Sequence, residues 1–262
     1  MRDVPEHRVD RSELIRIRGG RVRVRVQGDG DPLLLLNGFT RPMESWGPFI
    51  AALGDRTVVT FDAPGVGGSP TPVLPLSMSR LAALAVSVLD AAGLGTADVL
   101  GFSYGGAVAQ QLAFTLPDRV RRLVLVSTSC GVGAIPSTRA TPGSLRRPAD
   151  AGSWPRAHAL GSVWQSLGIS GWSSIPFLGA IRAPTLVVCG TRDRVVPPGN
   201  SAVLAQRIPG AELVMLPAGH DLQRPGPAGL LISTVEPFLA AGAGVEAPVG
   251  GYPNARRTSS ED

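Results

Sequence analysis

A serine flanked by glycines follows an apolar strand, and this junction restricts the fold more than any other stretch of the chain. Residues 98–106 read DVLGFSYGG, which contains the pattern G-x-S-x-G with Ser103 at its centre. In a strand-to-helix turn this sharp, a side chain on Gly101 or Gly105 would collide with the neighbouring strand or helix. The turn also forces the serine into a strained backbone conformation, so the sequence predicts an exposed, accessible hydroxyl at Ser103.

Strand and helix patterns alternate on both sides of this junction. An unbroken apolar run, typical of a strand buried on both faces, occurs at 33–36, and another buried strand is predicted at 57–61. Further strand patterns occur at 120–127, 185–189 and 212–216. Helical patterns occur at 46–53, 77–92, 107–114, 201–207 and 226–241. Two alternating strands within 13–27 form a hairpin in front of them. This order predicts a mostly parallel sheet of about eight strands with helices on both faces, whose chemistry gathers beyond the carboxyl ends of the strands.

The chain divides into one domain and two ends. We predict a flexible arm over residues 1–11, a single α/β domain over 12–241 and a disordered tail over 242–262, where Gly, Pro, Ala and polar residues dominate. Within the domain, residues from about 131 to 181 follow the sixth strand and have little regular pattern. They are the candidate for a lid.

The composition argues against several classes of protein. Although 44% of the residues are hydrophobic, no apolar run approaches the roughly 18 residues of a membrane span. The first eight residues lack the apolar core of a secretory signal, so a cytoplasmic location is expected. There, Cys130 and Cys189 should be reduced and buried, although neighbouring strand ends would also permit a disulfide. No histidine or cysteine has the spacing of a metal site, and no metal or other cofactor is expected.

Arginine carries the whole positive charge of the chain, because the sequence has a net charge of +5 and contains no lysine. The arginines are scattered among few aromatic residues, which argues against nucleic-acid binding. Five of them alternate with apolar residues near the N-terminus, namely Arg16, Arg18, Arg21, Arg23 and Arg25. The alternation predicts a solvent-facing side of a strand, and the other interpretation is a patch for an anionic surface.

A serine hydroxyl attacks a carbonyl at neutral pH only with the help of a base. His220 directly follows the last predicted strand, whereas His7 lies in the arm and His158 in the irregular region. His220 is therefore predicted to be the general base. A loop histidine without a catalytic role is the alternative.

The base in turn needs an acid that orients it. Asp193 follows the strand 185–189 and is the predicted partner of His220. Its alternative roles are a helix cap or an ion pair with Arg192 or Arg194. Asp221 is a weaker candidate, because a neighbour in sequence usually points away from the histidine. The order serine, acid, histidine along the chain is typical of the α/β-hydrolase fold.

Two backbone amides are candidates for stabilising a developing oxyanion. The amide of Tyr104 begins the helix after the serine. The amide of Phe39 lies in the loop after the strand 33–36, where Gly38 permits a close turn, and the Phe39 ring is predicted to line the acyl side of the pocket. An ordinary strand-exit turn is the alternative. The loop 62–69 lacks the Gly-Lys-Ser/Thr ending of a phosphate-binding loop and is predicted to be a structural turn near the pocket.

These motifs resemble the intracellular poly(3-hydroxyalkanoate) depolymerase family of α/β-hydrolases. The similarity spans most of residues 33–239. At 36–38 the chain has Asn37 where most relatives of the fold carry histidine. The other matching stretches are 61–69, 98–111, 122–129, 164–165, 171–175, 205–211 and 219–220. The resemblance implies an α/β-hydrolase fold with a short lid inserted after strand six. It also implies a serine hydrolase that cleaves esters of 3-hydroxyacids, in stored polyester or soluble oligomers, through an acyl-enzyme.

The resemblance also implies roles for individual residues. Ser103 would be the nucleophile, Asp193 the orienting acid and His220 the base, and the substrate-binding residues would be Phe39, Trp164 and Trp172. The expected partners are a small or oligomeric ester and a polyester granule surface, and the oligomeric state is left open.

One segment departs from the family, because the stretch between Ser137 and Trp164 is shorter than the family's lid. A lid shapes the acyl pocket and excludes water. The alternatives are therefore a general carboxylesterase, an acyltransferase or perhydrolase on the same scaffold, and a binding protein that has lost the reaction.

Overall fold

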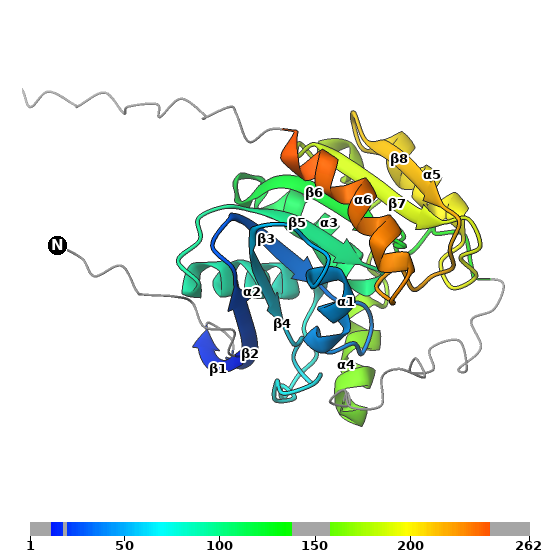
Figure 1. Ribbon diagram of the computed structural model, residues 1–262. Helices are drawn as coiled ribbons and strands as arrows, with labels where there is room; N and C mark the ends of the chain where they lie inside the picture. The colour runs from blue at the N-terminus through cyan, green and yellow to red at the C-terminus, as the bar shows by residue number, and fades with distance from the viewer. Residues whose placement is uncertain (1–11, 18–19, 138–157, 242–262) are drawn as a thin grey trace, which may run out of the picture.

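The structure is a computed structural model of the 262-residue chain, and it describes residues 12–17, 20–137 and 158–241 (Figure 1). The predicted arm, the predicted tail and residues 138–157 of the predicted lid lie outside the described residues. The assignments made for them stay predictions.

An eight-stranded sheet runs through the described residues in the order β1-β2-β4-β3-β5-β6-β7-β8. β1 (Ser12–Ile17) and β2 (Gly20–Gln27) form an antiparallel hairpin, and β2 also pairs antiparallel with β4 (Arg56–Phe61). The remaining neighbours are parallel: β3 (Asp31–Leu36), β5 (Ala97–Phe102), β6 (Val120–Val126), β7 (Thr185–Gly190) and β8 (Glu212–Leu216). The mostly parallel sheet of about eight strands is confirmed.

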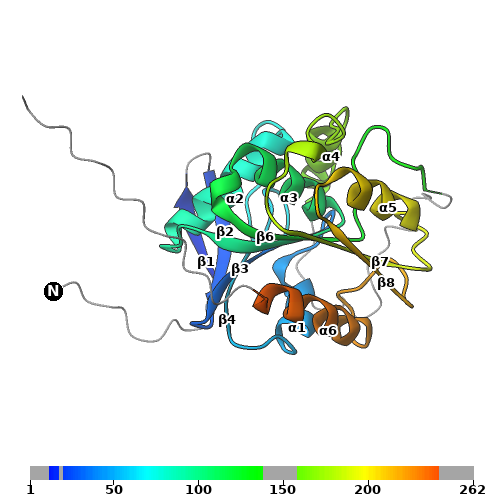
Figure 2. The ribbon, with the colours of Figure 1, turned by 90° about the horizontal axis from the view of Figure 1, so that it is seen from above.

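Helices cover both faces of this sheet, as Figure 2 shows from above. One layer contains α2 (Met78–Ala91), α3 (Tyr104–Thr115) and α5 (Pro198–Arg207), and the other contains α1 (Gly47–Ile50) and α6 (Pro227–Ala240). In β3, Leu34 and Leu36 pack in the core under the first layer, whereas Leu33 and Leu35 pack in the core under the second. A strand buried on both faces has no polar side, which explains its unbroken apolar run. No helix within the described residues is long and apolar enough to span a bilayer.

The first predicted helix is shorter than the sequence indicated. A 3-10 turn over Met43–Trp46 leads into α1, which has only four residues. The following amides of Ala52 and Leu53 bond to carbonyls three residues back, at 3.2 Å each, so the chain tightens into turns instead of extending the helix. Trp46 and Phe49 of this short segment are already buried in the core beneath the sheet, so a longer helix is not required.

Within the irregular region predicted over 131–181, the structure contains a helix that the sequence analysis missed. α4 (Ala159–Ile169) is preceded by His158, whose amide donates to the Gly65 carbonyl at 3.0 Å. Its sequence, ALGSVWQSLGI, has two glycines and two serines, which have weak helix propensity. Because Gly65 belongs to the loop after β4, this contact anchors α4 beyond the carboxyl ends of the strands.

The arginine-rich side of β2 is only partly a solvent-facing surface, which corrects the prediction for Arg23. Its guanidinium lies 2.6 Å from Glu44 and 3.1 Å from the buried Asp62. Asp62 also accepts the amides of Met43 and Gly68, each at 2.8 Å. Burial raises the pKa of Asp62. The loop 62–69 is therefore the structural turn that the sequence predicted.

Candidate active site

Ser103 occupies a sharp turn between β5 and α3. Its backbone has φ +52°, in the left-handed region that L residues rarely adopt. The Ser103 amide donates to the Val126 carbonyl at 2.8 Å, and the Thr128 hydroxyl donates to the Ser103 carbonyl at 2.7 Å. These contacts with β6 and the residues after it hold the serine in its strained conformation.

The glycines of the turn are required by close backbone approaches. A Cβ on Gly101 would lie 2.7 Å from the Cα of Gly106 in the first turn of α3. A Cβ on Gly105 would overlap the Leu36 carbonyl of β3. Any larger residue at either position would push α3 away from the sheet, as the sequence pattern predicted.

The loops after β7 and β8 are bonded to each other at the carboxyl edge of the sheet. The amides of Thr191 and Arg192 donate to the Leu216 and Ala218 carbonyls at 2.8 and 2.9 Å. A Cβ on Gly190 would overlap the carbonyl of Gly219, so only glycine permits this approach. The backbone contacts bring the loop of Asp193 beside the loop of His220.

Hydrogen bonds join the three predicted triad side chains. The distance from Asp193 Oδ2 to His220 Nδ1 is 2.8 Å, and the distance from His220 Nε2 to Ser103 Oγ is 3.2 Å. The Asp193 side chain is fully buried, and its other oxygen accepts the amides of Val195 and Val196 at 2.9 and 2.8 Å. These hydrogen bonds fix the orientation of the carboxylate, so Asp193 can in turn orient the imidazole of His220.

Asp221, the rival candidate for the acid, has other partners. Its carboxylate forms a two-pronged pair with Arg41, at 3.0 and 2.7 Å, and also accepts from Arg224 at 2.9 Å. The structure therefore brings Asp193, and not Asp221, to the imidazole of His220.

The two candidate oxyanion donors lie on adjoining elements. Tyr104 is the first residue of α3, so its amide is among the first-turn donors that have no intrahelical acceptor. The rings of Phe39 and Tyr104 meet edge to face, with centroids 6.1 Å apart. A Cβ on Gly38 would lie 2.9 Å from the Phe102 ring, so the loop that carries Phe39 passes directly over the end of β5.

This loop after β3 is held on its inner side by a polar network. Asn37 donates to the Pro42 carbonyl and the Ser45 hydroxyl at 2.6 and 2.8 Å, and its own oxygen accepts from the Gly38 amide and from Gln223. Gln223 is buried and follows His220 by three residues. The histidine loop and the loop of Phe39 are thus joined by side-chain hydrogen bonds.

A second tether comes from α4. The Thr40 amide donates to Gln165 Oε1 at 2.8 Å, and Thr40 itself has φ +57°. Gln165 is buried, with 5% of its surface exposed. The residue next to the candidate oxyanion donor Phe39 is therefore fixed by the helix beyond the sheet.

The two predicted substrate-binding tryptophans lie in different places. Trp164 donates its ring N–H to the Pro72 carbonyl at 2.9 Å and lines a small cavity beside Tyr104. Trp172 donates to Gln111 of α3 at 2.8 Å, and among the described residues no contact with the triad is found for it. Trp172 joins the segment after α4 to α3, and its contact with substrate stays a prediction.

Tyr104, which lines this small cavity, has a buried hydroxyl without a hydrogen-bond partner among the described residues. The cavity has a volume of about 10 Å³, room for about one water molecule, and Tyr104 and Trp164 both line it. Burial raises the pKa of Tyr104. The phenol therefore stays neutral at physiological pH.

The remaining titratable candidates lie outside the triad. His158 contacts the Thr71 hydroxyl at 2.7 Å, and His7 lies outside the described residues. Cys130 and Cys189 are both buried and form no disulfide with each other, and burial raises the pKa of each thiol. Across residues 12–17, 20–137 and 158–241, no cluster of three or more His, Cys, Asp or Glu side chains could hold a metal ion.

Sequence reasoning missed Arg41, Gln165 and Gln223, the residues that hold the loop of Phe39. Gln223 donates to Asn37 across 186 residues, and Gln165 accepts from Thr40 across 125. No local motif marks such contacts. The one signal was the shared Trp164-Gln165 pair in the resemblance, which gave no role for the glutamine.

Comparisons with known proteins agree with the fold described above. The model of the alpha/beta hydrolase family matches residues 33–231. The chain is 37% identical over 219 residues to the poly(3-hydroxyalkanoate) depolymerase of Ectopseudomonas oleovorans, covering 72% of this chain and 77% of that protein.

Two solved structures have the same fold over nearly their whole length. A hydrolase from Pseudomonas aeruginosa PA01 has a TM-score of 0.75 and 27% identity, covering 88% of this chain and 99% of that one. The enol-lactonase from Burkholderia xenovorans LB400 has a TM-score of 0.77 and 25% identity, covering 87% and 100%. The resemblance deduced from the sequence is confirmed, and the chain belongs to the alpha/beta hydrolase family.

Proposed function

We propose that this protein is a serine-dependent carboxylic ester hydrolase that works through an acyl-enzyme. The observation that carries the proposal is the continuous hydrogen-bonded series from Asp193 through His220 to the strained Ser103. This series satisfies the geometric requirement for an activated serine, because nucleophile, base and orienting acid are each within hydrogen-bond reach.

In the first half of the reaction, Ser103 Oγ attacks the ester carbonyl carbon while its proton moves to His220 Nε2. Asp193 accepts the Nδ1–H and stabilises the imidazolium that forms. The amides of Tyr104 and Phe39 donate to the carbonyl oxygen as it gains negative charge. The carbon–oxygen bond to the alcohol then breaks, and the alcohol leaves with the proton from Nε2.

In the second half, water replaces the alcohol. His220 Nε2 takes a proton from the water as its oxygen bonds to the acyl carbon, and the same amides stabilise the second tetrahedral intermediate. Ser103 Oγ then leaves and recovers the proton from Nε2. A carboxylic acid is released and the enzyme returns to its starting state.

For the substrate, we propose esters of 3-hydroxyacids, as oligomers or at a polyester surface. The support is the 37% identity to the poly(3-hydroxyalkanoate) depolymerase. A second support is the exposure of Leu160, Val163 and Leu167, which are spaced along one side of α4 beyond the carboxyl edge of the sheet. An apolar stripe near the site suits contact with a water-insoluble polyester granule. The cytoplasmic location expected from the sequence stays a prediction.

A fluorophosphonate probe tests the nucleophile. We expect covalent labelling of the wild-type protein and none of S103A, because the probe reacts only with an activated serine. Ester hydrolysis should fall by about 10⁴-fold or more in S103A. Folded wild-type protein that fails to label would support the non-catalytic binding protein instead.

Substrate class needs a separate measurement. Hydrolysis of p-nitrophenyl esters of increasing acyl length should be compared with release of acid from 3-hydroxyalkanoate oligomers. We expect oligomer cleavage by wild type and not by S103A. Cleavage of short simple esters without any oligomer cleavage would remove the depolymerase assignment and leave a general carboxylesterase.

A further inference from the structure

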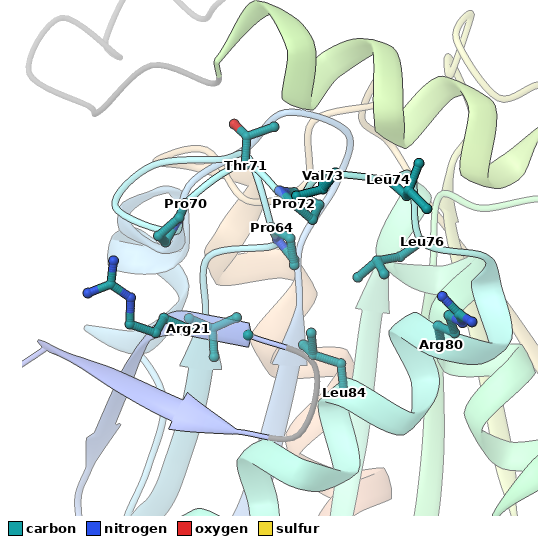
Figure 3. Close-up of a pocket in the computed structure, with 12 residues that line it drawn as sticks. Arg21, Pro64, Pro70, Thr71, Pro72, Val73, Leu74, Leu76, Arg80 and Leu84 are labelled. Atoms are coloured by element: carbon teal, nitrogen blue, oxygen red, sulfur yellow. The ribbon is translucent and has the colours of Figure 1, made fainter.

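A second, larger hollow lies apart from the triad. It has a volume of about 410 Å³, within the range of about 300–1,000 Å³ typical of small-molecule sites, and it lies among the start of β2, the loop after β4 and the start of α2 (Figure 3). Ser103, Asp193 and His220 are not among its lining residues. The proposed reaction therefore gives it no role.

The middle of this pocket is apolar. Leu84 of α2 and Pro64 and Leu76 of the adjoining loop lie between its two ends in Figure 3. At the rim, Val73 is 91% exposed and Leu74 is 66% exposed. Covering these exposed apolar side chains with the hydrocarbon part of a ligand removes apolar surface from water, which favours binding.

The rim is also rigid. Three prolines occur within residues 70–76, namely Pro70, Pro72 and Pro75, and the first two line the pocket. Each proline fixes its own φ, so the loop loses little conformational entropy when a ligand binds. The pocket is formed before its occupant arrives.

The charged lining is entirely cationic. Arg21 stands at one end of the pocket and Arg80 at the other, and no acidic residue lines it (Figure 3). Both side chains are exposed, and no ion pair is found for either of them among the described residues. Arg16 is directly opposite Arg21 in the β1–β2 hairpin, so a second guanidinium shares that side of the hairpin. Like charges directly opposite one another in a sheet repel, and an anion between them relieves the repulsion.

We propose that this pocket is an accessory binding site for an aliphatic carboxylate. The hydrocarbon chain lies on Leu76 and Leu84 and under the Val73 rim, and the carboxylate lies at the guanidinium of Arg21. Arg80 adds a longer-range attraction from the other end. The assignment does not depend on the proposed hydrolase activity.

The pocket lies next to the small cavity beside the serine turn. Pro64, Pro72 and Leu76 line both, and Tyr104 also lines the small cavity. The small cavity has room for about one water molecule, so an aliphatic ligand cannot pass through it toward Tyr104. A carboxylate in the accessory site would therefore leave the triad accessible.

Calorimetric titration with octanoate tests the proposal. The full-length protein is first treated with a fluorophosphonate, so that Ser103 is blocked and octanoate cannot enter the catalytic site; protein that does not label is titrated untreated. We expect one octanoate site, with Kd at least tenfold weaker in R21Q and about threefold weaker in R80Q. The Kd of octan-1-ol should rise less than twofold in either variant, because this alcohol has the same hydrocarbon chain as octanoate but no negative charge.

V73D provides a second variant at an exposed position. Its carboxylate at the pocket mouth should weaken octanoate binding at least fivefold by repulsion. Hydrolysis of p-nitrophenyl acetate by untreated R21Q, R80Q and V73D should stay within twofold of wild type, which separates this site from the triad. The proposal is overturned if blocked protein does not bind octanoate, or if R21Q and V73D bind it as tightly as wild type.

Discussion

Asp98 and Asp193 are both fully buried carboxylates at the ends of strands of one sheet, and they have opposite surroundings. Asp98, at the amino end of β5, lies 3.0 Å from both Arg56 and Arg121 and 3.6 Å from Arg122. Asp193, beyond the carboxyl end of β7, lies 2.8 Å from the imidazole of His220. One edge of the sheet therefore holds a fixed cluster of charge, and the other holds a carboxylate beside a group that can gain and lose a proton.

The partners of the two carboxylates suit different roles, stability for Asp98 and proton transfer for Asp193. Arginine keeps its charge at every accessible pH, so the pairs around Asp98 cannot exchange a proton during a reaction. Histidine changes its charge near neutral pH, so the pair of Asp193 and His220 can support proton transfer. The same carboxylate chemistry is thus used for folding at one edge and, in our proposal, for catalysis at the other.

The largest expected effect is that of D193N. The introduced amide would donate to His220 Nδ1, leaving Nε2 protonated and unable to accept the proton of Ser103. We expect kcat to fall by about 10³- to 10⁴-fold, with the urea midpoint changed little. Steady-state kinetics measure kcat, and urea denaturation of the same preparation measures the midpoint of unfolding. A decrease in kcat below tenfold would mean that Asp193 does not orient the base.

D98N is the matched substitution at the other edge. It leaves the arginines around Asp98 without their buried anion, and breaking a buried pair from one side costs about 3 kcal/mol. We expect the free energy of unfolding to fall by about that amount, while kcat/KM at a temperature well below unfolding stays within twofold. If D98N lowered kcat/KM as much as D193N, the proposed division between the two edges would be wrong.

An intermediate effect is expected at the tether between α4 and the loop of Phe39. Q165L removes the acceptor of the Thr40 amide, and the loop loses the bond that holds its strained conformation. We expect kcat to fall about tenfold while KM stays within threefold of wild type. The reason is that the loop carries the Phe39 amide, which is proposed to stabilise the oxyanion of the transition state.

Q165E is the matched control, since it keeps an acceptor oxygen at the same position and should restore most of the rate. The inhibition constant of a trifluoromethyl ketone, which forms a tetrahedral adduct with the serine, should rise in Q165L by the same factor as kcat/KM falls. Loss of substrate binding alone, with kcat unchanged, would assign Gln165 to the substrate pocket instead.

These contrasts also explain what could be predicted from the sequence. The strands and the candidate triad depend on local chemistry: an unbroken apolar run, two glycines around Ser103, and one histidine directly after the last strand. α4 was missed because glycine and serine weaken its helical pattern, and its apolar residues Leu160, Val163 and Leu167 face water and not the core. The tether of Gln165 to Thr40 joins residues 125 positions apart and has no local signature.

The smallest expected effect is that of D221N. This substitution removes one carboxylate oxygen from the two-pronged pair with Arg41, whose side chain also lies over the Phe102 ring with its guanidinium carbon 5.2 Å from the centroid. The Arg41 and Asp221 side chains are only 18% and 16% exposed, so the pair is partly buried. Weakening it by about 0.5–1 kcal/mol would lower kcat/KM about two- to fivefold, which is the decrease we expect. A loss as large as that of D193N would instead make Asp221 the acid that acts on His220.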